Sequence, residues 1–283
     1  MTTKRLGFLL AEKWDNWHTY IDAFEKEIAR LKTDVIITYA PPRPDGADGD
    51  AASIEEAADY LANNTDIIVT AGTRAALALK RATATTKTPF VFASVGDPGL
   101  SGLTPQKGGN FTGGHNQQVA LVKDRVDYML SRPKVFQQKF AVAGNYFNEP
   151  AKSAMTLASS LLGGAYLASI SPGDDIDAFV ANLKGMGIKS LYVCSDLYLT
   201  AKSKKLNQAC HAGLAAKKIK TMFEFAEHKN KHQGDEFYGL SFQDLFVQAA
   251  GYVDKIVRRK VAAAGDLPIY TTKVFGKAPA KKK

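Results

Sequence analysis

The stretch "IIVTAGTRAALALK", residues 67–80, predicts a β-strand that stops at a small turn and restarts as an α-helix. Its first residues are β-branched and favour a buried strand, while its alanine- and leucine-rich end favours a helix. Gly72 and Thr73 lie between the two parts and bring backbone N–H groups and a hydroxyl to the start of the helix. Groups of this kind can hold a carboxylate or another anionic group. The fold then depends on whether the rest of the chain repeats this strand–turn–helix unit.

Apolar strand-like runs alternate with helix-like segments along most of the chain. Strands are predicted at 5–11, 34–40, 66–70, 89–94, around Phe111, and at 139–145, 165–171, 190–195, 220–225 and 237–242. Helices are predicted at 17–31, 53–61, 73–84, 119–132, 150–163, 174–187, 200–217 and from 242 to about 264. This alternation is typical of parallel sheets covered by helices on both faces, so we expect an α/β fold with two successive units of similar size.

The composition excludes some classes of protein. The 283 residues are 45% hydrophobic and 23% charged, as in ordinary globular proteins. No run approaches the roughly 18 to 20 apolar residues that cross a membrane, so we expect no membrane insertion. The net charge of +9 is spread over helical segments and the terminal "FGKAPAKKK", without zinc-finger spacing or an RNA-binding aromatic motif. We therefore expect a solvated basic surface and no nucleic-acid partner.

Cysteine and histidine spacing predicts neither a disulfide nor a metal site. Cys194 lies in an apolar strand-like run and Cys210 in a helical one, so both are expected to be buried free thiols. His228 and His232 have the i,i+4 spacing of a metal pair, but lysines surround them and no HExxH motif is present. The chain also has no GxGxxG or Walker A sequence, so no metal or nucleotide cofactor is expected.

Ligands of such α/β units bind outside the carboxyl ends of the strands, where loops and helix N-termini converge. If the two units face each other, these ends line one ligand cleft, as in a clamshell. The candidate ligand-binding residues at the predicted strand ends are Trp14, Asp15, Asn16, Gly72, Thr73, Asp97, Asn145, Ser195, Asp196 and Glu224.

Some of these residues could have a structural role in place of a ligand-binding role. Trp14 could stack on a planar ligand, with Asp15 and Asn16 as polar partners. Trp17 fits a cleft or the core of its own helix equally well. Asp97 could hold an ammonium group, or it could only begin the Asp-Pro-Gly turn.

The carboxylates at two neighbouring strand ends, Asp196 and Glu224, allow two interpretations. They could form a general acid/base pair, since a pocket can push two carboxyl pKa values apart. Recognition of an ammonium group needs the same two carboxylates, but it does not require that their pKa values differ. Because no nucleophile elbow or Ser/His/Asp spacing accompanies them, we favour binding, with a small-molecule enzyme as an alternative.

Four motifs lie in order between residues 67 and 114: Gly72–Ala78 (GTRAALA), Pro89–Phe92 (PFVF), Asp97-Pro98, and Gly108–Gly113 (GGNFTG). Together they resemble the ABC-transporter substrate-binding family that includes tryptophan- and tyrosine-binding members. Proteins of that family typically carry Gly-Thr-Pro-Ala-Ala-Leu-Ala, Pro-[IV]-Val-Phe, an Asp-Pro turn, and Gly-Gly-Asn-[VF]-Thr-Gly. The order of the elements agrees from about residue 5 to about residue 270.

The resemblance implies a type I periplasmic-binding-protein fold, in which two Rossmann-like lobes with parallel sheets are joined by three crossover strands and close on a small ligand. The first-lobe contacts it implies are the Gly72-Thr73 turn and the Asp97 loop. The second-lobe contacts it implies are Asn145, Ser195, Asp196 and Glu224. The expected lobes are 1–116 with about 239–262, and 117–238 with about 263–283.

By resemblance, we expect a non-enzymatic solute-binding protein that captures a small molecule, such as an amino acid or an aromatic metabolite, for an ABC importer. Its expected partners are that ligand and an ABC permease. Arg74 replaces the family's proline and puts a cation beside the proposed anion-binding turn.

Two further departures leave a cytoplasmic ligand sensor of the same fold as an alternative. "KVFGKAPAKKK" ends the chain in place of an Asn-Leu-x-x-Ala helix, and no secretion leader precedes the first strand. We expect a periplasmic or extracytoplasmic location if a leader was removed, and a cytoplasmic one if Met1 is the natural start.

Overall fold

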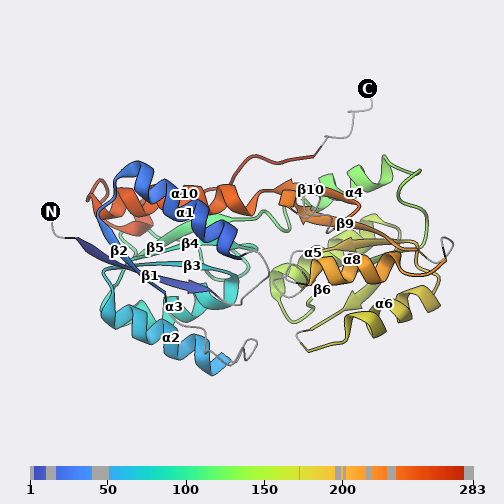
Figure 1. Cartoon of the computed structure of the whole chain (residues 1–283), viewed down its shortest axis with the longest axis horizontal. Coiled ribbons are helices and arrows are strands. Elements are labelled where there is room, and N and C mark those ends of the chain that lie inside the picture. Colours follow the sequence, from blue (N-terminus) through green and yellow to red (C-terminus); the bar gives the residue numbers. More distant parts are fainter. Residues whose placement is uncertain are drawn as a thin grey trace. The chain divides into compact units, whose positions relative to one another are not determined.

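The computed structural model describes residues 3–10, 17–39, 51–171, 173–194, 199, 202–214, 218–227 and 234–276 (Figure 1). The chain forms two units. Unit 1 comprises Met1–Asn116 and Phe242–Thr272, and unit 2 comprises Gln117–Ser241 and Lys273–Lys283. The chain therefore passes from one unit to the other three times. In the part of the chain that the structure describes, no helix is long and apolar enough to cross a membrane.

Unit 1 contains a five-stranded parallel sheet with the strand order β2-β1-β3-β4-β5. Its strands are β1 (Lys4–Leu10), β2 (Val35–Tyr39), β3 (Ile67–Ala71), β4 (Phe90–Val95) and β5 (Phe111–His115). Its helices are α1 (Trp17–Leu31), α2 (Ala51–Asn64), α3 (Thr73–Thr86) and α10 (Phe242–Val257), with the 3-10 turn η2 (Ala264–Asp266). α1 packs beside α10 and α2 beside α3, on opposite faces of the sheet (Figure 1).

The burial of these elements follows their sequence patterns. Every residue of β3 and β4 is buried, as expected for central parallel strands covered on both faces. At the sheet edge, β2 leaves 61% of Ile36 exposed. α1 has an apolar face at helical spacing: Tyr20, Phe24 and Ile28 are buried, and Leu31 at its end is half-buried.

Unit 2 contains a second five-stranded parallel sheet, with the order β10-β9-β8-β6-β7. Its strands are β6 (Phe140–Gly144), β7 (Tyr166–Ser169), β8 (Ser190–Val193), β9 (Lys220–Phe225) and β10 (Glu236–Leu240). Its helices are α4 (Val122–Leu130), α5 (Glu149–Leu161), α6 (Ile176–Gly185) and α8 (Ser203–His211). The predicted burial of both thiols is confirmed: Cys194 and Cys210 lie in separate core clusters and form no disulfide with each other.

Two predicted helices are too long at their carboxyl ends. α8 ends at His211 instead of 217, and α10 also ends early. The alanine-rich segment before Gly265 favours continuation of the helix to about 264, but α10 ends at Val257. The side chain of Arg258 turns to another part of unit 1, where its Nη2 donates to the carbonyl oxygens of Leu31 at 2.6 Å and Lys32 at 3.0 Å. Arg259 then takes a left-handed backbone conformation, with φ of 53°, which ends the helix.

Candidate ligand-binding sites

The turn that opens the sequence analysis lies at the carboxyl edge of the unit 1 sheet. Gly72 caps α3 with φ of 91°, a left-handed conformation that favours glycine, and its N–H donates to the carbonyl oxygen of Ser94 at 2.9 Å. Because the N-cap residue Gly72 has no side chain, it makes no side-chain hydrogen bond to the first turn of α3. The first backbone N–H groups of a helix have no intrahelical acceptor, so this turn presents donors suited to an anion.

The Asp97 loop lies beside this turn. The N–H of Gly96 points to Oγ1 of Thr73 at 3.5 Å, which brings the two predicted contacts of unit 1 together. Asp97 is half-buried, and its Oδ1 accepts the N–H of Leu100 at 3.0 Å. One carboxylate oxygen therefore stabilises the turn, so the two interpretations of Asp97 are compatible.

His115, which ends β5 at the same edge, was not predicted as a site residue from the sequence. Val95 and His115 are paired in the β4–β5 register, so the imidazole follows the strand next to the Asp97 loop. Burial lowers the pKa of His115, and the charge of Asp97 acts in the opposite direction. The available signal was the position of a polar, titratable residue directly after the Gly-Gly pair of a short strand.

In unit 2, the carboxyl edge carries Asn145 and two exposed aromatic rings. The Asn145 side chain accepts the N–H of Phe147 at 3.0 Å, which fixes a tight turn after β6. The rings of Tyr146 and Phe147 follow, and Phe147 is 87% exposed. Neither ring was predicted as a site residue, although an aromatic pair directly after a buried strand indicates a possible ligand contact at the strand end.

Glu224 occupies the end of β9 but is enclosed by protein. Its side chain is 1% exposed, and its Oε1 lies 3.1 Å from Nη1 of the equally buried Arg125. The hydroxyl of Tyr192 donates to the same oxygen at 2.6 Å. β8 lies between β6 and β9, so Asn145 and Glu224 are separated by one strand of the sheet.

Arg125 connects Glu224 to other segments of unit 2. Its Nε donates to the carbonyl oxygen of Tyr238 at 3.1 Å, and its Nη1 donates to that of Gln118 at 2.8 Å. Its Nη2 is buried and has no hydrogen-bond partner within the described residues. Burial would lower the pKa of Arg125, but the charge of Glu224 and the interaction with Tyr192 raise it, so the guanidinium stays protonated.

The remaining predicted ligand residues, Trp14, Asp15, Asn16, Ser195 and Asp196, lie outside the described residues, as do His228 and His232. Of the other five, Gly72, Thr73 and Asp97 come together in unit 1, whereas Asn145 and Glu224 occupy separate strand ends of unit 2. Within the described ranges, no group of three or more His, Cys, Asp or Glu side chains could hold a metal ion.

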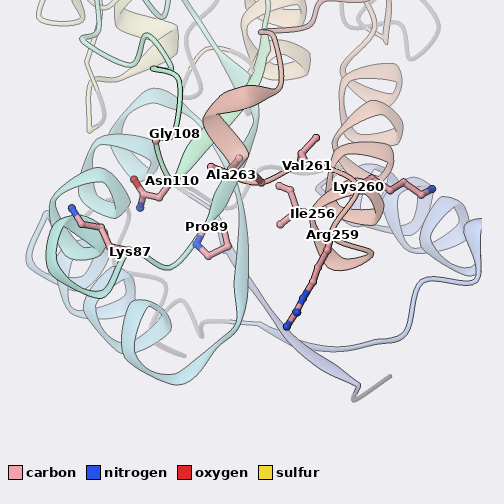
Figure 2. Close-up of a pocket in the computed structure, with 12 residues that line it drawn as sticks. Lys87, Pro89, Gly108, Asn110, Ile256, Arg259, Lys260, Val261 and Ala263 are labelled. Carbon is pink, nitrogen blue, oxygen red and sulfur yellow. The ribbon is translucent and has the colours of Figure 1, made fainter.

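Unit 1 also contains a cavity that no predicted ligand residue lines. Its volume is about 870 Å³, and Pro89 and Asn110, which precede β4 and β5, form part of its wall (Figure 2). The cavity therefore lies at the amino-terminal edge of the sheet, opposite the edge that carries Thr73 and Asp97.

Solved structures with the same fold are recognisable at low sequence identity. The ABC domain from Streptococcus pneumonia in complex with L-Trp has a TM-score of 0.74 and 16% identity over 94% of this chain and 89% of that chain. A conserved domain protein from Vibrio cholerae O1 biovar El Tor also has a TM-score of 0.74, with 19% identity over 96% of this chain and 90% of that one.

A third similar structure is an ABC transporter solute-binding protein from Rhodopseudomonas palustris BisB5 in complex with 3,4-dihydroxybenzoic acid. Its TM-score is 0.64, with 13% identity over 93% of this chain and 82% of that chain. No protein-family model and no curated protein matches the sequence. The predicted fold is confirmed: the chain has the type I periplasmic-binding-protein fold found in ABC transporter solute-binding proteins.

Proposed function

We propose that this protein is a non-enzymatic solute-binding protein that captures a small molecule between its two units for an ABC importer. The observation that carries the proposal is the cluster at the carboxyl edge of unit 1. There the N-terminus of α3, capped by Gly72 and beginning with Thr73, lies beside the loop of the half-buried Asp97. Carboxyl edges of parallel sheets are where α/β folds bind ligands.

The chemistry of this cluster suits a zwitterion. The Thr73 hydroxyl and the N–H groups at the start of α3 would hold a carboxylate. Asp97 would hold an ammonium group through the oxygen that Leu100 does not use. Because burial lowers the pKa of His115, its imidazole is neutral near pH 7 and can donate or accept a hydrogen bond without adding charge.

Unit 2 would contribute an apolar and aromatic surface. Phe147 and Tyr146 expose rings that can stack on a planar side chain, and the Asn145 turn holds them in place. We retain Trp14 as a stacking residue, and Asn16, Ser195 and Asp196 as polar contacts. A ligand that touches both units only when they are closed would shift the population toward that state.

An aromatic ligand with a carboxylate fits this combination of groups. The similar structures from Streptococcus pneumonia and Rhodopseudomonas palustris hold L-Trp and 3,4-dihydroxybenzoic acid, which share those two features. Catalysis has less support, because Glu224, half of the proposed acid/base pair, is enclosed with its Oε1 already bound by Arg125 and Tyr192.

Thermal unfolding with a ligand panel tests the proposal. The panel contains L-tryptophan, L-tyrosine, L-phenylalanine, 3,4-dihydroxybenzoate, organic acids and nucleosides. A compound at 100 times its Kd adds about 2.7 kcal/mol to the free energy of unfolding, a readable rise in Tm. Thr73→Val and Asp97→Asn should abolish the rise that an aromatic amino acid produces.

Matched controls separate binding from general stability. Thr85→Val makes the same change at the other end of α3, and Asp59→Asn makes it on the exposed face of α2. Both controls should keep the full rise in Tm. A rise that all four variants retain would place binding away from unit 1's carboxyl edge and contradict the proposal.

We also propose that the protein works outside the cytoplasmic membrane, together with an ABC permease. Fractionation of the native host should then recover it with extracytoplasmic proteins. Recovery in the cytoplasm, together with ligand binding in the panel, would favour the sensor instead.

A further inference from the structure

The cavity at the amino-terminal edge of the unit 1 sheet has the size and composition of a small-molecule site. Its volume of about 870 Å³ falls within the roughly 300 to 1,000 Å³ that is usual for ligand pockets. Much of its wall is apolar and comes from Pro89 before β4, Ile256 on α10, and Val261 with the alanines that follow. Such walls, with a few polar groups, are typical of ligand pockets.

Two turns that form part of the wall, one at 108–109 and one at 263–266, are joined by hydrogen bonds. One Asp266 carboxylate oxygen accepts the N–H of Gly108 at 2.9 Å, and the other accepts the N–H of Ala263 at 2.9 Å. The N–H of Gly265 donates to the carbonyl oxygen of Gly109 at 2.8 Å, and a Cβ at Gly265 would overlap the neighbouring turn. The wall is therefore preformed.

The charged residues that line the cavity are cationic, whereas the carboxylates of Asp254 and Asp266 bind lining residues from outside the lining set. Lys87, Arg259 and Lys260 are among its lining residues, and no acidic residue is. Lys260 is engaged, because its Nζ lies 3.1 Å from Oδ2 of Asp254. The side chains of Lys87 and Arg259 have no ion-pair or hydrogen-bond partner in the described part of the chain, and they lie on either side of Pro89 (Figure 2).

We propose that this cavity is a second ligand site, separate from the carboxyl-edge site, and that it binds an amphipathic organic anion. The apolar body of the anion lies against Pro89, Ile256 and Val261. Its carboxylate or sulfonate lies at the rim, where it gains from the positive charges of Lys87 and Arg259. The side-chain amide of Asn110 is not available to it, because Nδ2 donates to the carbonyl oxygen of Thr88 at 3.1 Å.

Fluorescence titration with 1-anilinonaphthalene-8-sulfonate tests the proposal on the full chain. The probe pairs an aromatic body with a sulfonate, and its emission rises in apolar surroundings. The double variant Lys87→Glu/Arg259→Glu should weaken its binding about tenfold, since two partly exposed attractions become repulsions. The control Lys26→Glu/Lys255→Glu changes the net charge equally, but neither residue lines the cavity, so its Kd should stay within about twofold of the wild type.

A cavity-filling variant and methyl NMR test separately whether the probe binds inside the cavity. Ala263→Trp fills the cavity without changing charge and should abolish the same component of binding. In ¹³C-methyl spectra of the wild type, the probe should shift Ile256 and Val261, and decanoate should displace the probe and lower its emission.

Two results would overturn the proposal: equal weakening in both double variants, or probe binding that leaves the Ile256 and Val261 methyl signals unmoved. L-Tryptophan binding at the carboxyl edge would be unaffected by either result, so the two proposals fail independently.

Discussion

Nη1 of Arg125 lies 3.1 Å from Oε1 of Glu224, and both side chains are shielded from solvent. This ion pair joins α4 to the carboxyl end of β9. Arg125 also donates to the carbonyl oxygens of Gln118 and Tyr238, which lie within three residues of two points where the chain passes between the units. A single guanidinium therefore holds together the strand end, the start of α4 and β10.

Arg125→Met should destabilise the protein by about 3 to 5 kcal/mol, because it leaves the Glu224 carboxylate buried without its counter-charge. Arg125→Met/Glu224→Gln removes both charges and should cost less than the sum of the two single changes. Urea denaturation followed by circular dichroism measures all three free energies of unfolding. Additive losses would mean that the 3.1 Å contact carries no coupling energy.

Glycine substitutions should have opposite effects at two positions. A Cβ at Gly113 would overlap the carbonyl oxygen and ring of Phe92 on the neighbouring strand, so Gly113→Ala should cost about 1 to 3 kcal/mol. Gly251 lies inside α10 with open space where an added Cβ would lie, so Gly251→Ala should stabilise by about 0.5 to 1 kcal/mol. Differential scanning calorimetry measures whether each substitution lowers or raises the stability of the protein. A stabilising Gly113→Ala would contradict the tight β4–β5 contact.

Asp235 should make the stability of unit 2 depend on pH. Burial raises its pKa, but the contacts of its carboxylate with Lys220 Nζ at 2.8 Å, Thr221 N at 2.9 Å and His211 Nε2 at 2.8 Å outweigh burial, and the net pKa is lowered. A lowered folded-state pKa adds stability above the unfolded value of about 3.9, and this stability is lost as pH falls through the folded pKa. Asp235→Asn should therefore cost about 2 to 3 kcal/mol at pH 7 and progressively less below about pH 4.

The exposed carboxylate of Asp177 provides the control for this measurement. It pairs with Lys205 at 3.1 Å on the surface, so Asp177→Asn should change stability by less than about 1 kcal/mol. Urea titrations at several pH values compare the two variants with the wild type. A loss in Asp235→Asn that stays constant from pH 7 to pH 3 would contradict the lowered pKa.

Local sequence predicted the elements whose signals are local. The β-branched strand and alanine-rich helix around Gly72 are present as β3 and α3, and the amphipathic helix 17–31 is α1. The end of α10 was not predictable in this way. Arg258 leaves the helix for carbonyl oxygens 226 and 227 residues earlier in the chain, and this contact overrides the helix propensity of the alanines that follow.

The candidate sites also depend on contacts between residues far apart in the sequence, which local patterns do not predict. Glu224 lies in the last part of β9, so its position near a strand end was predictable from the sequence. Its partner Arg125 lies on α4, 99 residues earlier, and no local pattern connects the two residues. The cavity beside Pro89 could not be predicted from local sequence, because its wall combines distant segments of the chain. Residues after α10 complete a wall that begins about 170 residues earlier in the chain, at Lys87.

We propose that one small molecule contacts the carboxyl edges of both units, and amide NMR of the full chain tests this proposal. The isotope-labelled full chain is titrated with L-tryptophan, or with whichever panel compound raises Tm most. The account expects Thr73 and Gly96 in unit 1 and Asn145 and Phe147 in unit 2 to shift along one common saturation curve. Shifts confined to one unit, or centred on the cavity beside Pro89 and Ile256, would contradict it.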